Sequence, residues 1–328
     1  MEETLVVQDL EKLFPVSRGF SSFFGKTTWV HAVNGVSFVI KRDEILGLAG
    51  ESGCGKTTTG RTVLKLCEPT SGRILFEGHD ITNLKPSAMK EYRPHMQMVF
   101  QDPYRSLNPR KNVMSILSLP IDTHRLAKSR SAKLEMIMQV LDEVRLHPAE
   151  RYVYKYPHEL SGGERQRIAL ARVLVLKPRL IVADEPVSML DALVRTSMLD
   201  LLLDLKKKTD FACLFITHDL ALARYTCDRI GIMYLGRIIE MGSKDAVINQ
   251  PAHPYTRALI SAVPVPNPSA RKVQVNVKGD VPSPMSIPSG CPFHPRCPYA
   301  DDRCRNDEQQ LVRIEADHYV ACYKHDLI

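Results

Sequence analysis

A glycine-rich segment constrains this 328-residue chain more than any other feature. It reads Gly50-Glu51-Ser52-Gly53-Cys54-Gly55-Lys56-Thr57, which is the G-x-x-x-x-G-K-[ST] pattern of a phosphate-binding loop. Glycine lets the backbone turn tightly and bring its N–H groups close to a polyphosphate. The apolar run Ile45–Ala49 precedes the loop, and a helix is expected to follow it with its unpaired N–H groups facing the anion. The pattern therefore predicts a strand, loop and helix that bind a polyphosphate.

The polar residues of this loop have separate chemical roles. Lys56 is expected to reach the β- and γ-phosphates as a point charge, and the Thr57 hydroxyl to bind Mg²⁺. The residues of the loop that we expect to contact ATP are Gly50, Ser52, Gly53, Cys54, Gly55, Lys56, Thr57 and Thr58.

Composition and hydrophobic patterning indicate a globular α/β chain. The chain is 44% hydrophobic and 25% charged, and no apolar stretch is long enough to span a bilayer. The net charge of +7 comes from scattered basic residues, which favours a solvated face over a nucleic-acid site. Apolar runs such as Leu180–Ala183 and Ala212–Ile216 alternate with helical patterns such as Ser129–Arg145, as in a parallel sheet covered by helices. The predicted core face of that helix contains Leu134, Ile137, Leu141 and Val144. Proline-rich residues 263–298 resist regular structure and place a domain boundary near Gln250–Asn267.

Polar residues follow two of the predicted strands, and a glutamine earlier in the chain is a further candidate. Asp184 and Glu185 end one apolar strand, where carboxylates can hold Mg²⁺ and polarise an attacking water. His218 follows the next strand and can bond the γ-phosphate or that water. The amide of Gln101 can join the Mg²⁺ coordination and loosen when the γ-phosphate leaves. The expected catalytic residues are Lys56, Gln101, Glu185 and His218, and the expected Mg²⁺ ligands are Thr57, Gln101 and Asp184.

A second helix start suited to an anion lies at Leu160–Arg167. Ser161 is a natural N-cap, Gly162 and Gly163 keep the approach open, and a helix follows. One phosphate chain does not need two such sites in one subunit. We therefore expect this helix to face ATP bound to another subunit.

Together these motifs resemble the set found in the ATP-binding subunit of an ABC transporter. The matching segments, in chain order, are Gly50–Thr57, Gln101, Leu160–Gln166, Asp184-Glu185, Ser188–Asp191 and His218. The resemblance implies an α/β fold with a P-loop (RecA-like) core, an antiparallel β subdomain and a helical subdomain near residues 102–168. It implies an ATPase domain at residues 1–250 and a small irregular cysteine-containing extension at 251–328.

The resemblance also implies two sets of contacts with nucleotide. Phe14 matches the aromatic residue that stacks on adenine. The residues implied to contact ATP of the partner subunit are Ser161, Gly162, Gly163, Glu164 and Asp191.

Segments outside the ATPase motifs resemble a narrower group, the oligopeptide and dipeptide permease ATPases. His253–Leu259, the proline-rich segment and the late cysteines are similar to their C-terminal extension, and Phe14–Gly25 and Arg105–Arg110 are similar to their F-type subunit. The resemblance implies a peripheral ATPase on the cytoplasmic face of the inner membrane. Its implied partners are a second homologous ATPase subunit, two transmembrane permease subunits and, indirectly, an extracytoplasmic peptide-binding protein, and no nucleic acid.

Two alternatives to peptide import stay open. Importers of oligosaccharides, nickel or glutathione have similar ATPases, because the cargo is selected by subunits that are separate from this chain. The alternative from another class is a soluble ABC ATPase acting on ribosomes or DNA, although such proteins commonly carry two cassettes or long coiled-coil inserts.

Two residues depart from the family pattern. Glu164 stands where the family usually has Gln, and its negative charge is expected to weaken the partner's nucleotide site modestly or to require a compensating cation. Val187 stands where Thr is common, and we expect little effect from it.

Four cysteines gather near the end of the chain, namely Cys291, Cys297, Cys304 and Cys322. Zinc modules usually pair cysteines about two to four residues apart, which differs from the spacing here, and disulfides fit a cytosolic ATPase poorly. Four thiolates, two of them followed directly by proline, suit a [4Fe–4S] cluster, and the family resemblance implies the same. Zn²⁺ and no metal at all stay open as alternatives, with His294 and His318 as spare candidate ligands.

Overall fold

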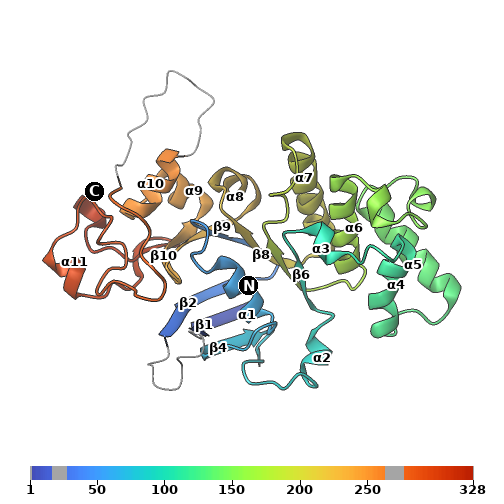
Figure 1. Ribbon diagram of the computed structural model, residues 1–328, viewed down its shortest axis with the longest axis horizontal. Coiled ribbons are helices and arrows are strands. Elements are labelled where there is room, and N and C mark those ends of the chain that lie inside the picture. The colour runs from blue at the N-terminus through green and yellow to red at the C-terminus, as the bar shows by residue number, and fades with distance from the viewer. Residues whose placement is uncertain (1, 17–27, 263–276, 328) are drawn as a thin grey trace. The chain divides into compact units, whose positions relative to one another are not determined.

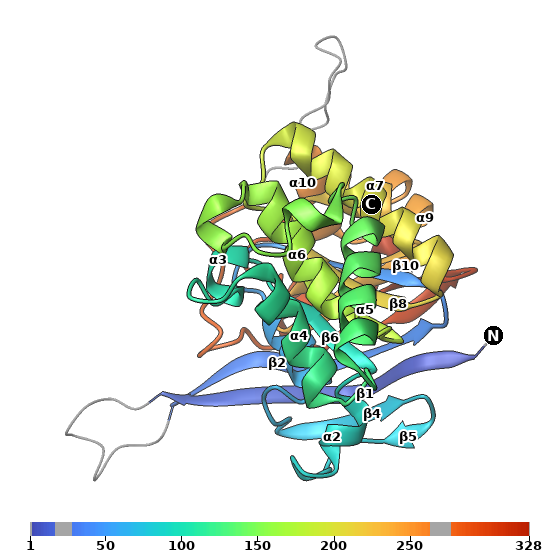
Figure 2. The same cartoon turned by 90° about the vertical axis from the view of Figure 1, so that its right-hand side faces the viewer.

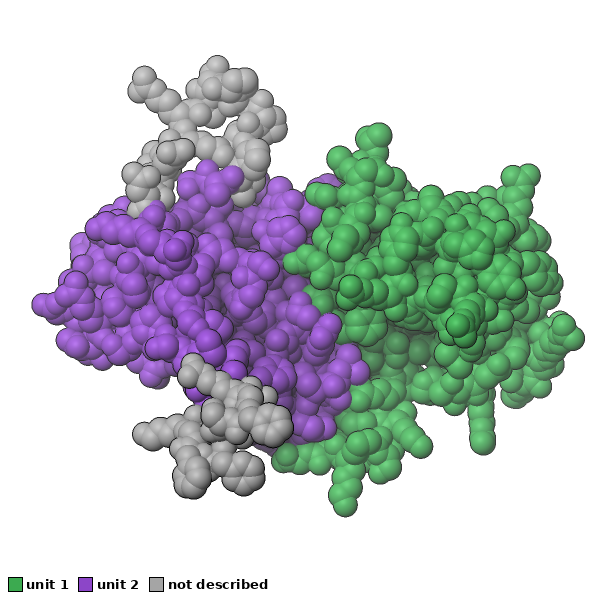
Figure 3. Space-filling model, in the orientation of Figure 1, with its two compact units in different colours: residues 1–4, 41–43, 83–214 green, residues 5–40, 44–82, 215–328 purple. Residues whose placement is uncertain are grey.

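The computed structural model describes residues 2–16, 28–262 and 277–327 (Figure 1). It divides into two compact units, which Figure 3 colours separately. Unit 1 contains residues 1–4, 41–43 and 83–214, and unit 2 contains residues 5–40, 44–82 and 215–328. Residues 17–25 of the predicted F-type segment and residues 263–276 of the proline-rich segment lie outside the described residues.

The main sheet of unit 2 carries the predicted loop strand. Its strands follow the order β11-β12-β10-β9-β3. β3 (Ile45–Ala49) is buried at all five residues and runs parallel to β9 (Arg229–Tyr234). β10 (Arg237–Ser243) is antiparallel to β9 and to β12 (His318–Val320), which in turn pairs with β11 (Val312–Glu315). The C-terminal hairpin of β11 and β12 thus extends the sheet that holds the loop strand.

A second sheet contains the strands β2, β1, β4 and β5 in that order. β1 (Glu3–Val16) pairs with β4 (Ser71–Phe76), and β4 pairs with β5 (His79–Asp80), both in antiparallel fashion. In β2 (Thr28–Lys41) the alternating residues Val36, Phe38 and Ile40 are buried. The predicted antiparallel β subdomain is therefore confirmed. The helices of unit 2 are α1 (Lys56–Val63), α8 (Leu220–Thr226), α9 (Lys244–Asn249), α10 (Pro254–Ala262), α11 (Asp302–Asn306) and the short η3 (His325–Leu327).

Unit 1 is mostly helical around two parallel strands, β6 (Met96–Val99) and β7 (Leu180–Asp184). Its helices are α2 (Met89–Tyr92), α3 (Pro103–Ser106), α4 (Val113–Thr123), α5 (Arg130–Glu143), α6 (Gly162–Leu174), α7 (Ala192–Thr209) and the short η1 (Ala149–Arg151) and η2 (Pro157–Glu159). Helices α4, α5 and α6 pack together, as Figure 2 shows. β8 (Ala212–Thr217) runs from unit 1 into unit 2.

The helix predicted over Ser129–Arg145 is α5, and Ser129 caps it by accepting a hydrogen bond from the N–H of Ala132. Ile137, predicted for its core face, is buried, but Leu134 is 39% exposed, so the prediction of a core position was wrong for that residue. In the described part of the chain, none of the helices has the length and apolar character to cross a membrane.

A buried carboxylate joins the C-terminal region to the sheet of unit 2. Glu240 of β10 is fully buried and accepts hydrogen bonds from the backbone N–H groups of Ala252 (2.8 Å) and His253 (2.9 Å). His318 Nε2 of β12 lies 2.8 Å from Glu240 Oε1. Buried charge is tolerated when it is surrounded by donors in this way. One side chain therefore connects β10, the start of α10 and the C-terminal hairpin.

His253, beside this carboxylate, is expected to make stability depend on pH. Its Nδ1 accepts a hydrogen bond from the N–H of Tyr255 (3.0 Å), and burial lowers the pKa of His253 from 6.5 to about 4, against the opposing effect of Glu240. At this histidine the unfolded chain therefore binds a proton more tightly than the folded chain does. The neutral ring contributes fully to the stability of the fold above pH 6.5, and this contribution is lost as the pH falls toward 4. Complete protonation of His253 is expected to lower the free energy of unfolding by about 3 kcal/mol.

Urea unfolding measured at several pH values between 7 and about 4.5 tests this expectation. In His253→Asn the amide oxygen can accept the bond from Tyr255 without titrating, so its stability is expected to fall less steeply with acid than that of the unmodified chain. The exposed His79, changed to Asn, is the matched control. Equal slopes for the chain and for His253→Asn would show that His253 is not held neutral.

Candidate functional site

The predicted phosphate-binding loop lies between β3 and α1 in unit 2. Gly50 has φ 154° and Gly55 has φ 108°. A Cβ atom at Gly50 would lie 2.2 Å from the carbonyl oxygen of Met233, and one at Gly55 would lie 2.0 Å from that of Ala32. Only glycine fits at these two positions, because the backbone conformation and the close approach both exclude a side chain.

Lys56 is held against the loop at the first residue of α1. Its Nζ donates hydrogen bonds to the carbonyl oxygens of Gly50 and Glu51, each at 2.8 Å, and the residue is 5% exposed. Burial raises the pKa of the neighbouring Cys54 thiol, which Lys56 opposes, so the thiol is neutral. No side chain caps α1, whose N-cap is Gly55. The loop therefore presents uncapped helical N–H groups and a fixed ammonium group, the arrangement that binds phosphates.

Two of the predicted catalytic residues meet in unit 1. Gln101 Nε2 donates a hydrogen bond of 2.8 Å to Glu185 Oε2. Glu185 directly follows β7 in a left-handed conformation (φ 45°), and its carbonyl oxygen accepts a hydrogen bond from Ser188 Oγ. The preceding Asp184 is 2% exposed. An uncommon backbone conformation at a non-glycine residue, here one of two adjacent acidic residues, is typical of a functional site.

The helix predicted after Ser161 is α6, and its start is a capping box. Ser161 Oγ accepts from the N–H of Glu164 (3.3 Å), and the Glu164 carboxylate accepts from the N–H of Ser161 (2.7 Å). Burial acts to raise the pKa of Glu164, but the bonds from Ser161 and Tyr152 and the charge of Lys155 outweigh it and lower the pKa. The sequence predicted Ser161 as the N-cap. The bond from the N–H of Ser161 to the Glu164 carboxylate was not predicted, although the S-x-x-E spacing is typical of a capping box.

The neighbouring glycines and Asp191 also have local structural roles. A Cβ atom at Gly163 would lie 2.6 Å from Val194 Cγ1, so glycine lets α7 approach α6, whereas Gly162 has more room. Asp191 is the N-cap of α7 and accepts a hydrogen bond from the N–H of Val194 (3.1 Å). These contacts stabilise the N-termini of α6 and α7, where the predicted residues lie.

Two further predicted residues lie in unit 2. His218 follows β8 directly and is exposed. Phe14 of β1 is 39% exposed, and Lys12 Nζ lies 4.8 Å from its ring centre. An aromatic ring with this exposure has a face that a base can contact.

The four late cysteines, which are close in sequence, also line one pocket in unit 2. His294 also lines it, and His318 does not, since that side chain faces Glu240. Burial, with a smaller contribution from the neighbouring thiols, raises the pKa of Cys291 to about 12 and that of Cys322 to about 11. Among the described residues, no group of three or more His, Cys, Asp or Glu side chains is arranged to hold a metal ion. The number and type of donors still fit a thiolate-bound group.

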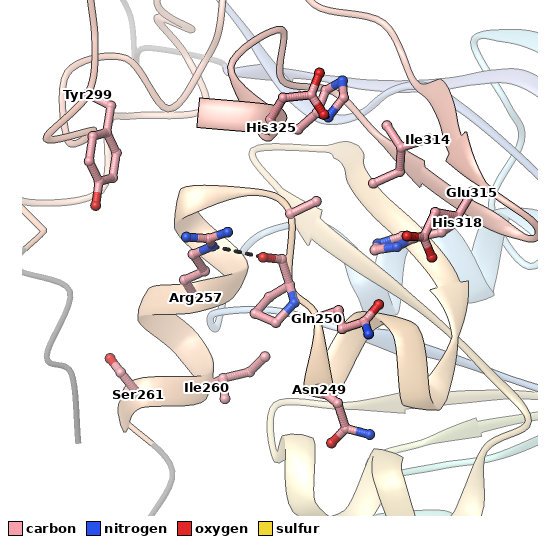
Figure 4. Close-up of a pocket in the computed structure, with 13 residues that line it drawn as sticks. Asn249, Gln250, Arg257, Ile260, Ser261, Tyr299, Ile314, Glu315, His318 and His325 are labelled. Carbon is pink, nitrogen blue, oxygen red and sulfur yellow. Dashed lines mark hydrogen bonds and ion pairs between the residues drawn. The ribbon is translucent and has the colours of Figure 1, made fainter. Parts of the chain in front are cut away.

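A larger cavity of about 760 Å³ lies elsewhere in unit 2, next to α10 and the β11–β12 hairpin (Figure 4). Arg257 Nε donates there to the carbonyl oxygen of Pro251 (2.8 Å). Acidic, basic and apolar side chains are mixed around the cavity. The spare candidate ligand His318 lines it, but none of the residues predicted to bind nucleotide or Mg²⁺ and none of the four late cysteines does.

The strand, loop and helix around Lys56 define a P-loop nucleotide hydrolase of α/β type. Comparison with known proteins narrows this class. Residues 33–188 match the ABC transporter family, and residues 239–304 match the C-terminal region of oligopeptide/dipeptide transporters. The oligopeptide transport ATP-binding protein AppF of Bacillus subtilis is 45% identical over 98% of this chain and 97% of its own length.

Two further matches agree with this result. The probable peptide ABC transporter ATP-binding protein y4tS of Sinorhizobium fredii is 46% identical over 97% of this chain and 89% of its own. A dimeric structure of the ATP-binding cassette MJ0796 with ADP and Pi is 26% identical, with a TM-score of 0.63 over 73% of this chain and 98% of that one. The chain belongs to the ATP-binding proteins of ABC transporters, in the group with the oligopeptide/dipeptide C-terminal region.

Proposed function

We propose that this chain is the ATP-hydrolysing subunit that powers an ABC importer of di- and oligopeptides. The observation that carries the proposal is the match to an oligopeptide transport ATP-binding protein over 98% of the chain, since it includes both the ATPase motifs and the C-terminal extension. The domain boundary proposed near residue 250 separates these two parts.

The predicted residues have these roles in the proposal. Lys56 and the N–H groups of residues 50–58 bind the phosphates of ATP, and Phe14 stacks on the adenine. Thr57, Asp184 and Gln101 supply oxygen ligands for Mg²⁺, which neutralises charge on the phosphates when bound. Glu185 polarises the attacking water, and His218 bonds the γ-phosphate or that water.

A second homologous subunit completes the proposed assembly. Residues Ser161, Gly162, Gly163, Glu164 and Asp191 contact ATP bound to that subunit. Two permease subunits and an extracytoplasmic peptide-binding protein complete the importer on the cytoplasmic face of the inner membrane. The carboxylate of Glu164 adds negative charge at the partner's nucleotide, and its bond to the N–H of Ser161 offsets part of that charge.

Reconstitution of the complete importer in liposomes tests this function. ATP hydrolysis and uptake are expected to increase when the binding protein is loaded with a short peptide, and not when oligosaccharide, nickel or glutathione is offered instead. Stimulation by one of those three cargoes would favour the corresponding importer. Co-purification with ribosomes or DNA, and not with membrane subunits, would favour the soluble ATPase.

The cysteine pocket is proposed to bind a [4Fe–4S] cluster, with Zn²⁺ as the alternative. The thiols of Cys291, Cys297, Cys304 and Cys322 would be its ligands. The protein purified without oxygen is expected to be brown and to contain iron and sulfide, and Cys297→Ser is expected to lose most of both. The matched control is Cys67→Ser, because Cys67 lies outside the pocket. A colourless protein with equimolar zinc would establish the alternative, and one without metal would exclude both.

A further inference from the structure

Glu51, the second residue of the phosphate-binding loop, is bonded through all of its polar groups. Its carboxylate accepts two hydrogen bonds from Arg296, Nη1 to Oε2 at 3.0 Å and Nη2 to Oε1 at 3.3 Å. Its N–H donates to the hydroxyl of Tyr255 (3.0 Å), and its carbonyl oxygen accepts from Lys56 Nζ (2.8 Å). One residue of the loop therefore connects the C-terminal region to the phosphate-binding lysine.

Arg296 is itself held in place by its surroundings. Its side chain is only 11% exposed, and the guanidinium carbon lies 5.8 Å from the ring centre of Tyr234 and 5.9 Å from that of Phe293. These rings contact each other and Tyr255, with ring centres 4.7 to 5.4 Å apart. A planar guanidinium that is packed beside two rings and bonded by two N–H groups to a carboxylate has little freedom to move.

We propose that Arg296 is a positioning residue for the phosphate-binding loop, so that the C-terminal extension helps to set the affinity of the same chain for ATP. Arg296 and Tyr255 hold Glu51, and Glu51 holds the Lys56 ammonium through its carbonyl oxygen. The inference rests on the proposed role of Lys56 in binding phosphate. Without the guanidinium, the Glu51 carboxylate would keep its charge without its partner, and the loop would sample other conformations when nucleotide is absent.

The experiment measures equilibrium binding of a fluorescent, non-hydrolysable ATP analogue to the full chain with Mg²⁺. Arg296→Met keeps a long side chain beside the rings and removes the charge, whereas Glu51→Gln changes the loop and leaves the extension intact. Each is expected to raise the Kd about tenfold, which is the order of one charge-assisted hydrogen bond. The Kd of the double variant is expected to be no higher than that of the weaker-binding single variant, because both substitutions remove the same interaction.

Two further variants separate positioning from a general loss of stability. Arg305→Met is the matched control, because Arg305 is an exposed arginine of the same extension and pairs with Asp302. Its Kd is expected to stay within about twofold of that of the unmodified chain. Arg296→Lys is expected to bind the analogue more tightly than Arg296→Met, because it keeps the charge. It is expected to bind more weakly than the unmodified chain, because an ammonium group cannot form the bidentate contact with the carboxylate.

The outcomes distinguish the inference from the proposed function. An unchanged Kd in both Arg296→Met and Glu51→Gln would overturn the positioning role while leaving the ATPase intact, and additive losses in the double variant would overturn it as well. If Arg296→Met does not fold, Glu51→Gln and its Kd decide the question. If the unmodified chain and Arg305→Met both fail to bind the analogue, the role of the loop itself falls, and the inference with it.

Discussion

Glu185→Gln is expected to leave ATP bound and to slow its hydrolysis by about a hundredfold or more, which is the usual contribution of a general base. The substitution removes the negative charge that we propose polarises water, and it keeps the size of the side chain. Gln101 can still donate to the amide oxygen at position 185, where it now donates to the carboxylate at 2.8 Å. Structure around β7 is therefore expected to survive. Steady-state phosphate release and equilibrium ATP binding, measured on the same samples, check the two halves of this expectation.

The matched control for this variant is Glu135→Gln, which removes a carboxylate from an exposed position of α5 in the same unit. Its hydrolysis rate is expected to equal that of the unmodified chain. Both variants are best measured in an assembly whose partner subunit has been inactivated, so that only this chain's own site contributes. Full hydrolysis by Glu185→Gln under those conditions would refute the catalytic role of Glu185, and loss of ATP binding would show that the residue acts on binding.

The predicted loop strand, loop and helix agree with the structure because their signals are local. Glycine at fixed spacing permits the positive-φ turns that the loop needs, and a short apolar run bounded by polar and turn residues is typical of a buried strand. The cap at Ser161 was predictable for the same reason. Leu134 shows the limit of local patterns, because the periodicity places it on the core face of α5 and the packing of unit 1 leaves it 39% exposed.

Contacts between distant parts of the chain could not be predicted in this way. Arg296 and Glu51 are separated by 245 residues, and neither is unusual in its own segment. The cysteine pocket was predictable only in part. The four residues could be grouped by their proximity in the chain, whereas only the structure places their thiols around one cavity. Glu240 looks like an isolated polar residue in an apolar strand until the donors from Ala252, His253 and His318 are known.

Glu240→Ala is therefore expected to be strongly destabilising. It leaves two backbone N–H groups and the His318 ring buried without their acceptor, and each such group costs about 1–3 kcal/mol. The unfolding free energy should fall by about 3 kcal/mol or more, which corresponds to a melting temperature lower by about 4 °C or more in a chain of this size. Glu240→Gln keeps one acceptor oxygen and is expected to lose less. Thermal melting followed by circular dichroism measures both changes.

Glu315→Ala is the control for this prediction, because Glu315 is an exposed residue of β11 in the hairpin that contains His318. A change within about 0.5 kcal/mol is expected there, as for most exposed positions. If Glu240→Ala melted at the same temperature as this control, water or a rearranged side chain would have to satisfy all three donors, and the carboxylate would not be what holds the hairpin and α10 to the sheet. A large loss confined to Glu240→Ala would instead mean that the C-terminal extension is anchored to the ATPase sheet by a polar contact and not by apolar packing alone.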